Sequence, residues 1–329
     1  MKDKFIKLLL GWIPLCFMFP VLAHAALSFV GPLDPANGFP RWYKDSRGVR
    51  LALCLDQNTF CQPLDGADPA LPISFPTNFA DESFWWTGEA LIDNVEGGQV
   101  LLVMAIEGGF AGGVPLAGDR IAFSRLRIRA RDVPLGTYRI THPYGQAIFE
   151  ATSPIGRQIN DTNDVGVQVE SFDGALAGQV GPFLVWNPAV APAAPAGFVG
   201  DPLVPHRVIG SPNGTNFLRV ERRINGTFRE VGFTNEFRIS GKLDTLPEEP
   251  ILSISPKGGI FGTAPMVTIT SSIPSTIFYT LDASDPLTSP TRLTYTGPFQ
   301  LPNCAALKFA ATTPNAQSDV KTELYIKAP

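Results

Sequence analysis

The sequence predicts an all-β protein: an N-terminal β-sandwich region followed by a small C-terminal Ig-like β-sandwich. Short runs rich in β-branched and aromatic residues recur along the whole chain, and many alternate apolar and polar residues with the period of two that strands require. The 31 glycines and 31 prolines are scattered between these runs as turn residues. No segment sustains a helical period, so we expect any helix to be short.

The first 25 residues are organised like an export signal. Three lysines among the first seven residues precede an apolar run at 8–22, and Ala23-His24-Ala25 supplies the small residues of a cleavage site. The run is short for a membrane span, which needs about 20 residues, although an uncleaved anchor is the alternative. We therefore expect residues 1–25 to be a cleaved signal peptide. The mature protein is expected to be exported (extracellular, at the cell surface or periplasmic) and to have no membrane span.

The longer strand candidates lie in residues 26–245. Residues 99–107 are apolar almost throughout, which predicts a strand buried on both faces, whereas residues 120–131 alternate twice with a change of parity. A β-bulge near Ser124-Arg125 would explain that change. The proline-rich segment 187–205 is expected to be an excursion inside one unit. Whether the region forms one large sandwich or two small ones stays open.

Three cysteines follow the signal. Cys54 and Cys61 are close enough to close a local disulfide, which contributes about 2.5 kcal/mol by the loop-entropy model in an oxidising compartment. The odd cysteine, Cys304, is expected to be a small buried hydrophobe. A metal site at Cys54 and Cys61 would need further ligands, and none follows at a suitable spacing, so we expect no metal and no cofactor.

Charge limits the expected partners. Removing the signal leaves 23 basic and 29 acidic residues, a formal net charge of −6. Proteins that bind nucleic acid depend on concentrated positive charge, so this balance argues against a nucleic-acid partner and against a general polyanion binder.

The clearest domain boundary lies at residues 244–250, a short acidic segment flanked by prolines. Six short strand candidates follow within about 80 residues, which is the strand density of an Ig-like sandwich. We therefore assign residues 26–245 to the N-terminal region and residues 247–329 to a separate Ig-like module.

Four motifs of the C-terminal part are familiar as a set. They are SPKGGIF (255–261), VTITSSIPSTIFYTLDASDPLTSP (267–290), YTGPFQL (295–301) and LKFAAT (307–312). In this order they resemble the C-terminal domain of chitobiase and β-hexosaminidase, over about a quarter of the chain. The resemblance implies a small accessory β-sandwich that brings no catalytic residues with it. The family usually has glycine where this chain has Ala283, so the turn either keeps a negative φ or is strained.

The turn in the second motif is rich in oxygen ligands. Asp282, Ser284 and Asp285 could be read as a calcium loop, but the positions where an EF-hand type loop needs glycine and glutamate hold leucines. We expect these side chains to cap backbone N–H groups of a turn. The glycine-rich segment 107–119 lacks the lysine of a phosphate loop and is expected to be a mobile loop.

Four aromatic residues are the candidate ligand-binding residues. Trp42, Tyr43, Trp85 and Trp86 would suit stacking on sugar faces if exposed, although core packing is the default for aromatic side chains because they bury so much area. Adjacent strand residues face opposite sides, so the indoles of Trp85 and Trp86 point away from each other, which leaves room for one of them at the surface.

A row of four arginines has two interpretations. Arg125, Arg127, Arg129 and Arg131 share one face of a strand, where they would either grip an acidic polymer or pair with neighbouring carboxylates. The negative net charge favours the second interpretation.

The leading functional hypothesis is an exported, non-catalytic binding or structural protein with a polysaccharide or cell-envelope glycan as ligand. The first alternative is a secreted, glycan-directed hydrolase with its site in 26–245, using His142 or the carboxylates of Asp81, Glu82 and Glu89. The second is a surface adhesion or assembly subunit with Ig-like spacers. The oligomeric state is left open.

Overall fold

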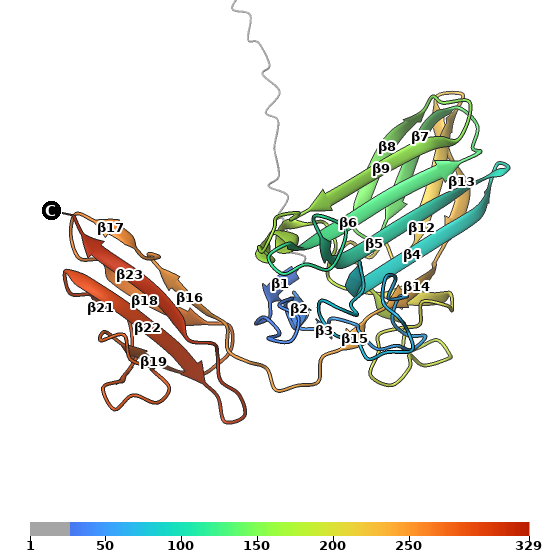
Figure 1. Cartoon of the computed structure of the whole chain (residues 1–329). Coiled ribbons are helices and arrows are strands. Elements are labelled where there is room, and N and C mark those ends of the chain that lie inside the picture. The colour runs from blue at the N-terminus through green and yellow to red at the C-terminus, as the bar shows by residue number, and fades with distance from the viewer. Residues whose placement is uncertain (1–26, 329) are drawn as a thin grey trace, which may run out of the picture.

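The computed structural model describes residues 27–328, so the expected signal peptide at 1–25 lies outside the described residues. The chain is all-β, as predicted, and the helical structure in 27–328 is limited to a 3-10 helix, η1 (Asp173–Ala177). Within that range no helix has the length and apolarity needed to span a membrane. Figure 1 shows a larger N-terminal body and a smaller C-terminal body joined by an extended segment. Each body has its own hydrophobic core.

The larger body is built around a seven-stranded antiparallel sheet of order β10-β11-β14-β4-β5-β6-β9. Its strands are β4 (Ser83–Val95), β5 (Gly98–Phe110), β6 (Arg120–Arg131), β9 (Arg157–Val165), β10 (Val185–Trp186), β11 (His206–Ile209) and β14 (Glu236–Ser240). One face, which we name the inner face, carries buried residues such as Leu102 and Ile128. The opposite, outer face carries the arginine row of β6.

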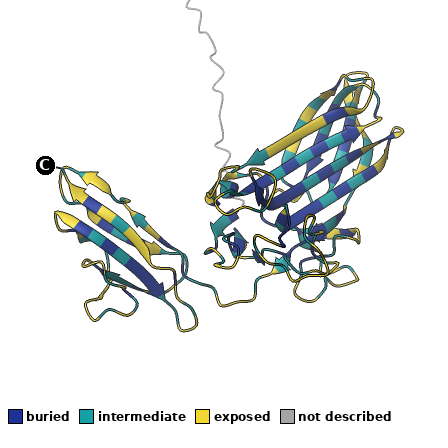
Figure 2. Cartoon of the chain, in the orientation of Figure 1, coloured by how far each residue is buried: buried dark blue, intermediate teal, exposed yellow. Residues whose placement is uncertain are grey.

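A four-stranded sheet of order β13-β12-β7-β8 contributes to the same core. Its strands are β7 (Gly136–His142), β8 (Gly145–Ala151), β12 (Leu218–Ile224) and β13 (Thr227–Thr234). Alternate residues on these strands, such as Tyr138, Ile140 and Val220, are fully buried with the inner-face residues. Figure 2 shows the resulting alternation of buried and exposed positions along the strands.

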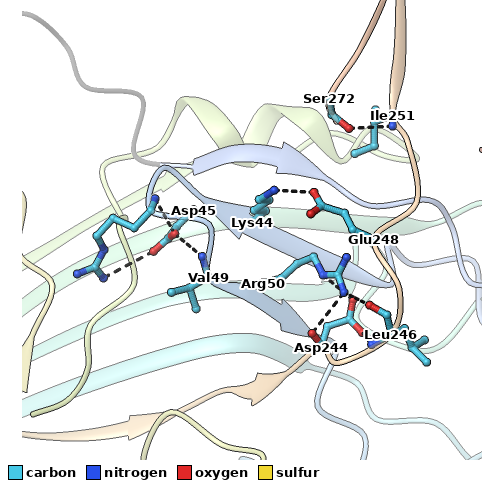
Figure 3. Close-up of polar contacts among 10 residues, drawn as sticks. Lys44, Asp45, Val49, Arg50, Asp244, Leu246, Glu248, Ile251 and Ser272 are labelled. Atoms are coloured by element: carbon cyan, nitrogen blue, oxygen red, sulfur yellow. Dashed lines mark hydrogen bonds and ion pairs between the residues drawn. The ribbon is translucent and has the colours of Figure 1, made fainter. Parts of the chain in front are cut away.

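A small sheet of order β1-β2-β3-β15 holds the first and last strands of the larger body. Its strands are β1 (Leu27–Val30), β2 (Trp42–Asp45), β3 (Arg50–Ala52) and β15 (Lys242–Leu243). The buried carboxylate of Asp45 closes the β2–β3 turn by accepting hydrogen bonds from the backbone N–H groups of Arg47 and Val49 (Figure 3). The predicted disulfide, Cys54–Cys61, is present in the loop after β3.

The C-terminal body is a β-sandwich of two sheets, of orders β16-β18-β21 and β17-β23-β22-β19-β20. Its strands are β16 (Leu252–Ser255), β17 (Gly259–Phe261), β18 (Met266–Ser271), β19 (Thr276–Thr280), β20 (Leu293–Thr294), β21 (Phe299–Gln300), β22 (Cys304–Thr312) and β23 (Lys321–Lys327). Its core includes Leu252, Val267, Leu307 and Phe309, all fully buried. The predicted Ig-like sandwich is therefore observed, whereas the exact division at residues 245 to 247 stays a prediction.

The segment that joins the two bodies is held against the small sheet (Figure 3). The Arg50 guanidinium forms an ion pair with Asp244 at 2.9 Å and also donates to the Leu246 carbonyl. The Lys44 ammonium lies 2.5 Å from a carboxylate oxygen of Glu248. The acidic residues that marked this boundary in the sequence are therefore partners of cations on β2 and β3.

Two strand expectations are wrong, and both bear on the outer face. The pairing of β6 with β5 is continuous past Ser124, so there is no bulge there. The parity changes because Phe123 is an apolar residue on the outer face, 5% exposed under covering loops. On β5, Leu101 and Val103 are only partly buried, so that strand is not buried on both faces along its whole length.

Candidate functional site

A pocket of about 490 Å³ lies over one end of the outer face. Strands β5, β6 and β9 form its floor, and the loops that precede β4 and β6 contribute its walls. Five carboxylates and one guanidinium line it: Asp65, Asp81, Glu82, Glu107, Asp164 and Arg125. We name this feature the acidic pocket. Phe123 lines this pocket and is 5% exposed.

Strand register assembles the polar floor. Arg125 on β6 is the Cα partner of Asp164 on β9, and Glu107 lies on β5 opposite Phe123. The Arg125 guanidinium donates two hydrogen bonds to Asp164, through Nε at 2.8 Å and Nη2 at 2.9 Å. Its Nη1 donates to Glu107 at 2.9 Å, and the guanidinium carbon lies 4.9 Å from the centroid of the Phe123 ring. Arg125 is therefore fixed by two carboxylates and an aromatic face.

Glu107 is the most unusual group in the acidic pocket. Its side chain is 2% exposed, and burial raises its pKa to about 8 although the positive charge of Arg125 opposes the change. The negative charges of Glu82 and Asp164 raise it further. Arg125 carries one positive charge and pairs with two carboxylates, those of Glu107 and Asp164. One guanidinium cannot neutralise two carboxylates. Glu107 therefore binds a proton more tightly than an exposed glutamate does.

The remaining carboxylates come from the loop that follows the disulfide. The backbone N–H of Asp81 donates to the Asp65 carbonyl at 2.8 Å, which ties the two ends of this loop together. A Cβ on Gly66 would lie 2.7 Å from the Asp81 carboxyl carbon, and Gly66 has a φ of +90°. Glycine is therefore needed here for both the close approach and the backbone conformation. Glu82 is exposed beside them.

The pocket combines groups that suit a polyhydroxylated ligand. Carboxylates accept hydrogen bonds from hydroxyl groups, the guanidinium donates them, and Phe110 and Phe123 supply apolar wall. Within 27–328, no three histidine, cysteine, aspartate or glutamate side chains are arranged to hold a metal ion.

The four predicted ligand-binding aromatics are buried, with Trp42 at 3% and Tyr43, Trp85 and Trp86 at 0% exposure. Core packing, the default for these residues, is therefore observed, and neither of the two neighbouring indoles lies at the surface. Trp85 sits at a register shift in β4 and packs edge-on against Tyr43, while Trp86 packs against Phe183. Both faces of β4 are covered here, and each indole N–H donates at 3.0 Å to a backbone carbonyl. No stacking face of these four residues is open to a sugar.

The predicted hydrolase residues are only partly brought together. Asp81 and Glu82 line the acidic pocket, but Glu89 lies on β4 away from it, 3.6 Å from Arg238. His142 lies at the end of β7 in the other sheet, 3% exposed, where burial lowers its pKa to about 4. It does not line the pocket. Glu107 is a pocket residue that the sequence does not identify, because it ends the predicted strand 99–107 and begins the glycine-rich segment 107–119 expected to be a loop, whereas β5 continues to Phe110.

The four arginines of the β6 row differ in their partners. Arg125 is paired with carboxylates, as expected, but Arg127 donates only to the Thr162 hydroxyl, at 3.1 Å. Arg129 and Arg131 form no ion pair with a described carboxylate. The expectation that the whole row is neutralised is wrong for these three.

In the C-terminal body, the predicted turn is a capped turn. The Asp282 carboxylate accepts hydrogen bonds from the Ser284 hydroxyl, from the Thr291 hydroxyl at 2.6 Å and from the Ser284 N–H at 3.1 Å, and these bonds lower its pKa to about 2. Asp285 accepts from the backbone N–H of Leu287. Ala283 has a φ of +62°, so this turn carries the strain that a family glycine would avoid. The free Cys304 is exposed, which corrects the expectation of a buried residue.

Comparison with known families agrees with the C-terminal motifs. The family model of the chitobiase/beta-hexosaminidase C-terminal domain matches residues 256–322. No curated protein and no solved structure matches the chain. The matched segment contains the capped turn and most of the C-terminal sandwich, and it leaves the acidic pocket outside.

Proposed function

We propose that this protein is an exported, non-catalytic glycan-binding protein of the cell surface or extracellular space, and that the acidic pocket holds a sugar of its ligand. The pocket is the observation that carries the proposal. Its partly buried carboxylates, the fixed guanidinium of Arg125 and two phenylalanine rings supply hydrogen-bond acceptors, donors and apolar wall in one concave site. An ordered site of this kind binds without reorganising its polar groups.

Two further features support an exported, glycan-related role. The C-terminal module belongs to a family named for enzymes that act on amino sugars, and such modules serve as accessories. The Cys54–Cys61 disulfide is compatible with an oxidising compartment, as is the signal-like start of the chain.

The test is retention of the mature protein on insoluble polysaccharides such as chitin, cellulose and cell-wall sacculi. Asp81→Asn and Glu82→Gln should each weaken retention, because an amide replaces a hydrogen-bond acceptor in the pocket. Glu89→Gln is the matched control, because Glu89 lies on the same sheet but outside the pocket. If the protein is retained by none of these polymers, or if the pocket variants bind as well as the control, the proposal is wrong.

One observation favours a second function, hydrolysis of a glycan. Glu107, whose pKa burial raises to about 8, lies in one pocket with other carboxylates, and glycosidases use such a pair as the acid and its partner. Release of reducing ends from the same polymers, abolished in Glu107→Gln, would support hydrolysis over simple binding. Polymers that are bound but stay intact would leave binding as the function.

A further inference from the structure

Four arginines form a continuous cationic surface beside the acidic pocket. Arg127, Arg129 and Arg131 lie on the outer face of β6, and Arg157 at the start of β9 is the Cα partner of Arg131. We name these four residues the arginine strip. Alternate residues on a strand are separated by about 6.6 Å, so the β6 members form a straight row on an otherwise flat face.

The strip differs from the other two arginines of β6. Arg120 donates to Glu170 through two nitrogens, and Arg125 donates to Asp164 and Glu107 through three. No member of the strip lies within 4 Å of a carboxylate of the described residues. Their contacts are neutral: Arg127 donates to Thr162, and Arg157 lies 3.5 Å from the Asn160 amide oxygen.

Positive charge is therefore concentrated on the strip, and the carboxylates of Asp164 and Glu107 offset only part of it at Arg127. Burial and the neighbouring guanidinium groups of Arg125 and Arg129 lower the pKa of Arg127, and burial and the charges of Arg157, Arg125 and Arg131 lower that of Arg129. The Nε of Arg129 is buried and has no hydrogen-bond partner within the described chain. An anion placed on the strip would relieve the repulsion between these guanidinium groups.

The groups around the strip narrow the class of anion. Thr162 and Asn160 are exposed hydroxyl and amide groups on β9, and Leu101 and Val103 provide low aliphatic surface on β5. The carboxylates that face the same surface are Asp164 and Glu107, both held by Arg125, and Glu89, which lies two strands away beside Arg238. No tryptophan, tyrosine or phenylalanine is exposed among the strip and its neighbours on β5 and β9, whereas proteins that bind single-stranded nucleic acid stack bases on such side chains.

We propose that the arginine strip binds an acidic polysaccharide, one whose sugars carry carboxylate or sulfate groups. Guanidinium forks pair with the anionic groups, and Thr162 and Asn160 bond to sugar hydroxyls. This inference shares with the proposed function only the class of ligand, a glycan, and it places that ligand on a different surface. The acidic net charge of the chain does not oppose it, because the attraction is local and is screened beyond about 10 Å.

The test measures binding of the full mature protein to soluble polygalacturonate and to a sulfated polysaccharide, with dextran as the uncharged reference. The triple variant of Arg127, Arg129 and Arg131 to Ser should weaken binding by at least about tenfold at low salt and flatten the salt dependence. The matched control is the triple Ser variant of Arg207, Arg223 and Arg229, which removes the same charge from exposed positions elsewhere. It should bind like the wild type.

Because Arg129 is partly buried, a second variant keeps the test valid if the triple variant fails to fold. Arg131→Ser with Arg157→Ser alters only exposed residues and should weaken binding in the same direction. Lysine at the same two positions keeps the charge but not the planar fork, and should restore only part of the affinity.

Three outcomes would overturn the inference: no binding to either acidic polysaccharide, equal loss in strip and control variants, or tighter binding to single-stranded DNA or to anionic vesicles. The glycan-binding function of the acidic pocket and the acidic-polysaccharide site on the arginine strip can be refuted independently. Pocket variants at Asp81 and Glu82 should still bind the acidic polymers, and strip variants should still be retained by neutral insoluble ones.

Discussion

Replacing Glu107 by Gln should remove a pH dependence from the stability of the larger body. Burial raises the folded-state pKa of Glu107 to about 8, from 4.5 in the unfolded chain, so the folded state binds its proton more tightly. Between these two values unfolding releases a proton, and the free energy of unfolding therefore falls as the pH rises. One pKa unit corresponds to about 1.4 kcal/mol, so the loss between pH 5 and pH 7.5 is at most about 3.4 kcal/mol. For a body of this size that equals a fall in Tm of up to about 10 °C.

The assay is thermal unfolding of the wild type, Glu107→Gln and Glu89→Gln at pH 5, 6, 7 and 7.5. The amide is neutral at every pH, and Arg125 keeps both hydrogen bonds to Asp164, so the Glu107 variant should show a much flatter profile. Glu89 is partly exposed on the neighbouring strand, and its variant should follow the wild type. Parallel profiles for the wild type and Glu107→Gln would refute the reasoning, because they would mean that Glu107 is ionised in the fold throughout this range.

Three other predictions concern the turn, the disulfide and the joining segment. Ala283→Gly should stabilise the C-terminal body by about 0.5 to 1 kcal/mol, because relief of the positive-φ strain exceeds the entropy that glycine adds to the unfolded chain. Ala316→Gly is the control: Ala316 has an ordinary φ, so this variant should be less stable than the wild type. Calorimetry measures both changes. Cys54→Ser should cost the larger body about 2.5 kcal/mol, and an unchanged Tm under non-reducing conditions would contradict this. Glu248→Lys should increase the protease sensitivity of the joining segment, and adding Lys44→Glu should reverse the increase.

Local sequence patterns predicted the strands and the C-terminal module well. Alternation along residues 120–131 identified β6, and the four ordered motifs identified the module that the family match covers. The disulfide followed from the short separation of Cys54 and Cys61. In each of these cases, the residues that predict the structural element lie within that element or next to it in the sequence.

The acidic pocket and the burial of the tryptophans could not be predicted in this way. Glu107, Arg125 and Asp164 meet because the strand register aligns residues up to 57 positions apart, and nothing local specifies that register. Alternation correctly separates Trp85 from Trp86, but it does not reveal that both faces of β4 are covered. The burial of Phe123 likewise depends on loops distant in sequence. The change of parity that Phe123 causes in the sequence pattern predicts a bulge, which the structure does not contain.

The small sheet has a mechanical consequence. It contains β1 and β15, the strands through which the larger body connects to the two ends of the chain, and the joining segment is fastened to it by Lys44 and Arg50. A pulling force between the chain ends would enter and leave through this sheet, so we expect the ion pairs of the joining segment to break first and the two-residue pairing of β15 with β3 to break next. Until the pairing of β15 with β3 breaks, we expect strands β5, β6 and β9 to bear no force. The acidic pocket and the arginine strip, which lie on these strands, should therefore keep their shape until then.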